Sequence, residues 1–167
     1  MTLRGFGPVI DRRSEVLILG SFPGAASLAA GFYYAHPRNQ FWPILSALLG
    51  EPLAELGPEP RYRRVRAHRV AIWDVLAACE REGSLDADIR APAANDFDVL
   101  RRLGPRIRAV MFNGRAAGRF ERRFADAGYV TRVLPSTSPA HAGMRAGDKL
   151  SAWREAFEAL RDPGARR

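Results

Sequence analysis

The chain has 167 residues, of which 47% are hydrophobic and 26% charged, a composition that excludes a disordered protein and is normal for one compact domain. The formal net charge of +8, with a sequence pI of about 10.8, favours a polyanionic partner such as nucleic acid, although an arginine-rich composition alone would give the same charge. The single cysteine, Cys79, excludes an internal disulfide and a paired-cysteine metal site, and no apolar run approaches the ~20 residues that cross a bilayer.

We therefore expect a cytoplasmic protein of one domain, spanning residues 1–167. The first nine residues lack the basic, apolar and small-residue sections of a secretory signal. No cluster of His and Cys has the spacing of metal ligands, so neither a metal nor another cofactor is expected. A monomer is the expected state for a chain of this size.

The first third of the chain predicts one strand, a long loop and one helix. Residues 15–20 are an apolar run that ends in glycine, which is the pattern of a buried parallel strand. Residues 21–36 are interrupted by glycine and proline and predict a loop. Apolar residues at helical spacing predict a helix over residues 39–49, and three prolines make residues 51–60 a surface connection.

The rest of the chain predicts strands that alternate with helices. Strands are predicted at residues 70–73, 107–112 and 129–134, and helices at residues 75–81, 96–103, 114–125 and 147–160. Asn95 or Asp96 is the expected cap of the second of these helices. The alternation predicts an α/β fold with a parallel sheet covered on both faces, and such sheets bind ligands at the carboxyl ends of their strands.

Three segments near the expected carboxyl ends carry most of the unusual chemistry. Residues 20–24 (Gly-Ser-Phe-Pro-Gly) form either a loop that exposes backbone N–H groups to a ligand or an ordinary turn. Residues 33–42 put two aromatic rings and several polar groups at the start of a helix, which suits stacking and hydrogen bonding. Residues 134–142 offer hydroxyl groups suited to phosphate contacts.

These segments resemble the motifs of the hypoxanthine-DNA (deoxyinosine) glycosylases. The resemblance lies in residues 20–24, 35–42 and 134–139, with residues 73–75 and 81–86 in addition, and it covers nearly the whole chain. That family is a branch of the uracil-DNA glycosylase superfamily, close to the mismatch-specific uracil-DNA glycosylases. The resemblance implies a three-layer α/β/α sandwich around a four-stranded parallel sheet, and an enzyme that flips a base out of DNA and hydrolyses its bond to deoxyribose.

The chain departs from the wider superfamily in both short loop motifs. Phe22 stands where mismatch-specific relatives carry a functional Asn, and Leu134 stands where relatives have His or Asn. The first loop also has no carboxylate, whereas uracil-excising relatives have a water-activating Asp there. These departures argue against strong uracil excision. In hypoxanthine-excising members, the Asn at the position of Asn39 is the residue associated with activity.

Asn39 and Ser21 are the candidate catalytic residues. A carboxamide can hold a water with its oxygen and donate to a departing base with its nitrogen, and the alternative role for Asn39 is a helix cap. Ser21 can donate to the base or to a phosphate, or it can satisfy its own turn. The sequence does not decide which of the two residues positions the attacking water.

Four residues are candidates for binding the flipped base. The resemblance implies that Tyr34 stacks on the base, the alternative being a core tyrosine, while Phe22 either closes the other wall or plugs the core. Asp74 ends the second strand, where its carboxylate could accept the N1–H of hypoxanthine or could cap the helix expected at residues 75–81. Asn113 ends the third strand and either contacts the base or makes a turn.

Two sets of residues are candidates for holding the DNA backbone. The first set comprises the hydroxyl groups of the third motif and a nearby histidine: Ser136, Thr137, Ser138 and His141. The second set is a cluster of arginines that would equally suit a solvated helix face: Arg61, Arg63, Arg64, Arg66 and Arg69.

The expected reaction is that of a monofunctional glycosylase acting on DNA that contains a deaminated base. Bifunctional glycosylases form a Schiff base with an amine, whereas the only lysine here is Lys149, in the last expected helix. Three alternatives stay open. They are excision of uracil or xanthine by the same fold, a lesion-binding module without catalysis, and a small-molecule nucleotide enzyme, which the lack of a Gly-Lys-Ser/Thr phosphate loop disfavours.

Overall fold

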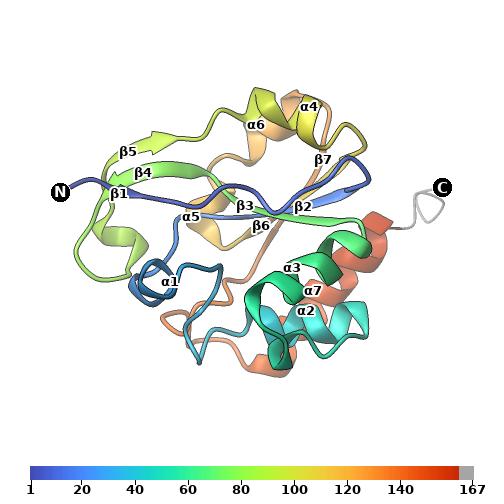
Figure 1. Cartoon of the computed structure of the whole chain (residues 1–167), viewed down its shortest axis with the longest axis horizontal. Coiled ribbons are helices and arrows are strands. Elements are labelled where there is room, and N and C mark those ends of the chain that lie inside the picture. Colours follow the sequence, from blue (N-terminus) through green and yellow to red (C-terminus); the bar gives the residue numbers. More distant parts are fainter. Residues whose placement is uncertain (162–167) are drawn as a thin grey trace.

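A four-stranded parallel sheet runs through the middle of the molecule (Figure 1). The computed structural model describes residues 1–161. In their side-by-side order, the strands are β3 (Val70–Asp74), β2 (Val16–Gly20), β6 (Ala109–Asn113) and β7 (Val130–Leu134). Every residue of β2, β3 and β6 is buried, as is usual for parallel strands whose two faces are both covered.

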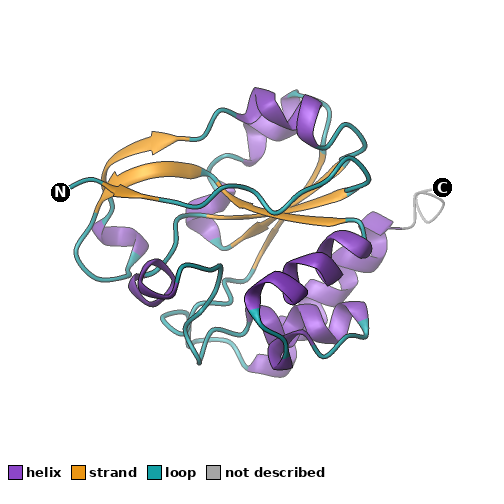
Figure 2. Cartoon of the chain, in the orientation of Figure 1, coloured by secondary structure: helices purple, strands orange, loops and turns teal. Residues whose placement is uncertain are grey.

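Helices cover both faces of this sheet (Figure 2). One face packs against α2 (Phe41–Leu49), α3 (Pro58–Ala67) and α7 (Ala146–Arg161), and the other against α4 (Leu100–Leu103), α5 (Arg115–Gly118) and α6 (Glu121–Asp126). Residues of β2 alternate between two cores, with Ile18 in the first and Leu19 in the second. The predicted three-layer α/β/α sandwich around four parallel strands is therefore confirmed. Within residues 1–161, no helix is long and apolar enough to cross a membrane.

A second, antiparallel sheet lies beside the first, and the sequence did not predict it. Its strands pair in the order β1 (Leu3–Arg4), β4 (Leu76–Glu80) and β5 (Arg90–Ala94). The helix predicted at residues 75–81 is therefore wrong. The N–H of Leu76 donates to the carbonyl of Ser21 at 3.1 Å, so the chain leaves β3 still extended. Pairing with strands distant in sequence then overrides the helical preference of an alanine-rich segment.

Shorter elements differ from the predictions in four other places. The predicted loop at residues 21–36 contains a helix, α1 (Ala25–Ala30), which ends at Gly31 with a positive φ of 78°. The connection at residues 51–60 holds the 3-10 turn η1 (Leu53–Glu55) and the start of α3. The helix predicted at residues 96–103 is the 3-10 turn η3 (Phe97–Val99) followed by α4. The one predicted at residues 114–125 is divided into α5 and α6.

The last helix fastens the third motif to the core through Trp153. This side chain is fully buried, and its ring meets that of Phe41 edge-on with 6.3 Å between centroids. Its indole N–H donates to the carbonyl oxygen of Pro135 at 2.9 Å. The packing of α7 and the position of the loop after β7 therefore depend on the same residue.

We predict that Trp153→Ala lowers the free energy of unfolding by about 3–5 kcal/mol, because it leaves a cavity in the core. Trp153→Phe keeps an aromatic ring but loses the N–H donor, so it should lower the free energy of unfolding by less than Trp153→Ala does. Arg154→Ala, at the next and exposed position, is the control and should change stability by less than about 0.5 kcal/mol. Urea denaturation measures all three, and equal effects of Trp153→Ala and Arg154→Ala would contradict the assigned packing.

Candidate active site

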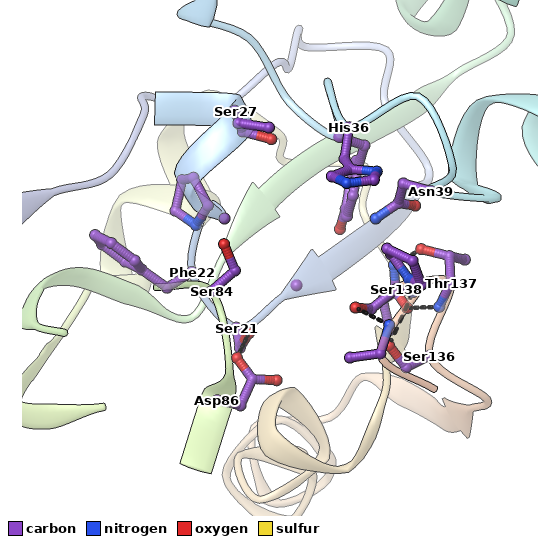
Figure 3. Close-up of a pocket in the computed structure, with 18 of the residues that line it drawn as sticks. Ser21, Phe22, Ser27, His36, Asn39, Ser84, Asp86, Ser136, Thr137 and Ser138 are labelled. Atoms are coloured by element: carbon purple, nitrogen blue, oxygen red, sulfur yellow. Dashed lines mark hydrogen bonds between the residues drawn. The ribbon is translucent and has the colours of Figure 1, made fainter. Parts of the chain in front are cut away.

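A cavity of about 240 Å³ opens at the carboxyl ends of the parallel strands (Figure 3). Three of its lining residues end a strand: Gly20 ends β2, Asp74 ends β3 and Asn113 ends β6. The other lining residues come from the loops that follow, including all three motifs of the sequence analysis. Parallel strands end at one edge of a sheet, which is why segments far apart in the sequence share this cavity.

The floor of the cavity is formed by Tyr34 and Asp74 beside Gly20. The Tyr34 ring stacks on the ring of Phe41, with 3.8 Å between centroids and 20° between planes. A Cβ on Gly20 would lie 2.6 Å from Tyr34 Oη and 2.5 Å from Asp74 Oδ1, so only glycine permits this approach. Tyr34 itself has a positive φ of 53°, a conformation that costs energy for a residue with a side chain and that clusters at functional sites.

Asp74 does not cap a helix, because the residues after it form β4. Asp74 is buried, with 3% of the residue exposed. Burial, and after it the negative charge of Asp86, raises the pKa of Asp74 from the ordinary value of 3.8 to about 7, against a smaller opposing effect of Arg81. Asp74 Oδ2 and Tyr34 Oη are buried and have no hydrogen-bond partner within residues 1–161. A polar ligand in the cavity would satisfy both atoms.

Asn39 lies across the cavity from Ser21 (Figure 3). Its Oδ1 accepts a hydrogen bond from the N–H of Phe41 at 3.0 Å, at the start of α2, where Gln40 is the capping residue. The oxygen thus supports the helix start, as in the alternative role considered for Asn39. The amide nitrogen points toward the middle of the cavity (Figure 3), where it can donate to a ligand.

The third motif is held in place by Asn113. The Asn113 carboxamide accepts from the backbone N–H of Thr137 at 3.0 Å and donates to its hydroxyl at 2.9 Å. This pair is buried, so the geometry favours the structural role of Asn113. Ser136 and Ser138 line the cavity, whereas His141 is exposed and lies outside the cavity lining.

The first motif is held by the connection between β4 and β5. Ser21 Oγ donates to Asp86 Oδ1 at 2.6 Å, a contact between residues 65 positions apart. Phe22 borders the cavity, but its ring is buried in the second core and points away from the cavity in Figure 3. The Arg81 guanidinium lies over that ring, 5.3 Å from its centroid. The geometry thus favours the core role of Phe22.

Asp86 is a residue of the site that the sequence reasoning did not single out. It lines the cavity beside Ser21 (Figure 3). Its segment, residues 81–86, carried part of the family resemblance, which was the available signal. The sequence alone predicts a helix just before Asp86 and gives no sign of the β4–β5 hairpin that brings this residue to the first motif.

Comparison with known proteins assigns a family to this arrangement. A sequence model described as the uracil DNA glycosylase superfamily matches residues 8–161. The chain belongs to the uracil DNA glycosylase superfamily. It is therefore an enzyme of the DNA glycosylase class, as the motifs predicted, and its substrate is DNA.

Relatives of this superfamily member support the narrower branch. Two proteins named hypoxanthine DNA glycosylase, from Methanosarcina barkeri and Methanosarcina acetivorans, are each 38% identical to it. The alignments cover 95% and 94% of this chain and 99% of each relative. The solution NMR structure of a candidate uracil DNA glycosylase from Methanosarcina acetivorans superposes with a TM-score of 0.85 at 37% identity, covering 97% of this chain and 100% of that one.

The arginine cluster of this glycosylase is largely engaged in the fold. Arg61 donates to the carbonyl of Leu56 at 2.7 Å and lies 4.7 Å from the ring centroid of Trp42. Arg69 pairs with Glu15 at 2.9 Å, just before β3 and hence at the amino end of the sheet. Arg63 and Arg64 are exposed on α3, and none of the five arginines lines the cavity. The geometry therefore favours the solvated helix face over contact with DNA at the cavity. Within the described residues, no group of three His, Cys, Asp or Glu side chains could hold a metal ion.

We predict that the stability of the protein depends on pH through Asp74. Its folded pKa lies above its unfolded value, so its contribution to stability is present below pH ~4 and is lost as pH rises to ~7. Across this window, the unfolding free energy of the native chain should fall relative to that of Asp74→Asn, by at most about 1.4 kcal/mol per pH unit. Denaturant titrations at several pH values test this, and parallel curves for the two proteins would contradict it.

Proposed function

We propose that this chain is a monofunctional glycosylase that removes hypoxanthine, the deaminated form of adenine, from DNA and leaves an abasic site. The observation that carries the proposal is the cavity floor. An aromatic ring stacked on Phe41 lies beside two buried polar atoms, Tyr34 Oη and Asp74 Oδ2, that lack partners within residues 1–161. A flipped purine offers a flat face to the ring and polar edges to the two atoms. The names of the two Methanosarcina relatives support the same base.

Asp74 is the residue we assign to reading the base edge. The ionised carboxylate accepts the N1–H of hypoxanthine, whereas adenine presents only a lone pair at N1 and would be repelled. Uracil also has a ring N–H that Asp74 can accept, so this contact alone does not reject uracil. Xanthine excision by the same site is the other alternative. The apolar residues Phe22 and Leu134, which replace polar residues of uracil-excising relatives, favour hypoxanthine.

Asn39 is the residue we assign to stabilising the leaving base. Charge develops on the purine as the glycosidic bond breaks, and a donor fixed in place beforehand lowers the energy of that charge. The hydrogen bond from Phe41 N–H to Asn39 Oδ1 fixes the carboxamide and leaves its Nδ2 toward the cavity. Tyr34 stacks on the base, with Phe22 at the rim, and Ser21 lies on the opposite wall as the second catalytic candidate.

We assign contact with the DNA backbone to the loop after β7. Ser136 and Ser138 line the cavity, and their hydroxyl groups suit phosphates next to the flipped nucleotide. Thr137 is buried and its hydroxyl accepts from Asn113, so Thr137 holds the loop in place instead of facing a phosphate. His141 lies outside the cavity lining. The net charge of +8 adds a sequence-independent attraction to DNA. We propose that the chain acts as one domain and as a monomer, in the cytoplasm.

We predict that the native protein cleaves a labelled duplex containing one hypoxanthine after alkaline treatment, and that Asn39→Asp is slower by about 10²–10³-fold. Aspartate keeps an oxygen for the N–H of Phe41 but has no amide donor, so α2 should form normally. Asn39→Ala loses both functions and should be no faster than Asn39→Asp. Single-turnover rates measure the effect, and duplexes with uracil or xanthine compare the alternative bases.

Two outcomes of this experiment would contradict the proposal. Asn39→Asp cleaving at the native rate would remove the assigned role of the amide nitrogen. Tight binding to the hypoxanthine duplex without cleavage of any of the three duplexes would instead indicate a lesion-binding module. Circular dichroism of each variant ensures that a lost rate reflects chemistry and not unfolding.

We also predict that borohydride does not trap the protein on DNA during base excision. A trapped adduct requires a free amine that forms a Schiff base with the sugar. The only lysine, Lys149, is 1% exposed, and its Nζ donates to the carbonyl of His141 at 2.6 Å. A covalent protein–DNA band after borohydride treatment, seen by denaturing electrophoresis, would overturn the monofunctional assignment.

A further inference from the structure

A carboxylate stands beside the first motif although the motif itself contains none. Asp86 lies in the 3-10 turn η2 (Asp86–Asp88), between β4 and β5, and lines the cavity. Its Oδ1 accepts the hydroxyl proton of Ser21 at 2.6 Å. The two side chains face each other on the wall across from Asn39 (Figure 3). The cavity therefore has an acidic group next to the first loop, supplied by a different part of the chain.

The position of Asp86 is fixed by further contacts from the same connection. Ser84 Oγ accepts from the N–H of Ala25 at 2.8 Å, and Arg81 donates to the carbonyl oxygen of Pro23. With the contact from Ser21, three hydrogen bonds tie residues 81–86 to residues 21–25. The carboxylate is thus held on a fixed scaffold, as a catalytic group must be to act on a bound substrate.

The two carboxyl groups of the cavity, on Asp74 and Asp86, lie in different environments, which suits them to different roles. Asp74 is buried, and the nearby charge of Asp86 adds to the effect of burial in raising the Asp74 pKa. Asp86 is exposed and accepts a hydrogen bond from the Ser21 hydroxyl. Paired carboxyl groups with contrasting environments are the usual basis for dividing acid and base roles in glycoside cleavage.

The other candidates for holding a water are weaker acceptors in this geometry. The Asn39 oxygen already accepts the N–H of Phe41 at 3.0 Å. The Ser21 hydroxyl donates its proton to Asp86, so it can orient a water but cannot readily take a proton from it. A carboxylate oxygen is a better proton acceptor than either group.

We propose that Asp86, oriented by Ser21, is the catalytic carboxylate that binds the attacking water. The inference rests on the proposed base excision. The water oxygen forms a bond to C1′ of the deoxyribose while the bond from C1′ to N9 of hypoxanthine breaks. The electron pair of the C1′–N9 bond leaves with the base. One water proton passes to Asp86 and is then released, by way of solvent, to the departing base, which restores the carboxylate. The products are an abasic sugar and free hypoxanthine.

The test compares Asp86→Asn with Asp88→Asn in single-turnover excision from the hypoxanthine duplex. Asp88 is an exposed acid of the same 3-10 turn and does not line the cavity, so its variant is matched in charge change and location. We expect Asp86→Asn to slow excision about 10²-fold or more and Asp88→Asn to keep the native rate. Affinity for a duplex with a cleavage-resistant 2′-fluoro deoxyinosine should be retained by both.

A rescue experiment separates chemistry from a merely structural role. In Asp86→Ala, added formate can enter the space of the lost side chain and accept the water proton, so the rate should rise with formate concentration. Asp88→Ala should show no such rise. A structural defect at Asp86 would not respond to formate, even if the variant were partly misfolded.

The possible failures are distinguishable. A native enzyme that excises the base, with Asp86→Asn within about threefold of its rate or Asp86→Ala unresponsive to formate, overturns the role of Asp86 alone. A native enzyme that excises uracil or xanthine but not hypoxanthine overturns the proposed base, and the same variants on that duplex then test Asp86. A native protein that excises none of the three overturns both proposals.

Discussion

Pairing between β2 and β3 sets Gly20 directly opposite Asp74 at the end of the two strands, and the cavity depends on this register. The pairing continues past the strand ends, because the N–H of Val75 donates to the carbonyl of Gly20 at 2.8 Å. A slip of one residue would turn Asp74 to the opposite face of the sheet and place a side chain where the floor of the cavity requires none. Tyr34 reaches the same point from a distant loop, so backbone pairing in the core determines the shape of the polar floor.

The cavity combines features that weaken a fold with features that restore it. A buried carboxyl group without a partner in the described residues and a tyrosine with positive φ both cost free energy. The apolar layers on either side of the sheet supply the stability that tolerates them, and aromatic stacking of Tyr34 on Phe41 adds to it locally. Such a balance is expected where polar groups must be ready for a ligand before it arrives.

Three of the four parallel strands could be predicted from the sequence because β2, β3 and β6 are short, mostly apolar runs that end in a glycine or a polar residue. The fourth strand, β7, contains Thr131 and Arg132, and its prediction rests on the β-branched residues on either side of them. The strand at residues 75–81 could not be predicted, since its alanine, leucine and cysteine residues suit a helix as well as a strand. Its strand conformation is decided by pairing with Leu3 and Arg4 at one end of the chain and with β5 on the other side. These pairing partners cannot be inferred from the sequence pattern of residues 75–81 alone.

The sequence likewise predicted the segments that form the candidate site, but not the contacts of each side chain. The resemblance identified the three motifs that meet at the cavity, but it did not show how individual amides are used. The carboxamide of Asn113 is occupied by Thr137, and the oxygen of Asn39 by Phe41, and both contacts depend on how loops close in space. Asp86 belongs to the same class, because only the folded hairpin brings it to Ser21.

The last helix holds the loop after β7 from two points one helical turn apart. Trp153 binds the carbonyl of Pro135 and Lys149 binds that of His141, so both ends of the loop are attached to one face of α7. Because of these two hydrogen bonds, a displacement of α7 also displaces the loop. Loosening of α7 by heat or denaturant would therefore displace the loop that we propose to contact the DNA backbone, and affinity for DNA would report on the packing of this helix.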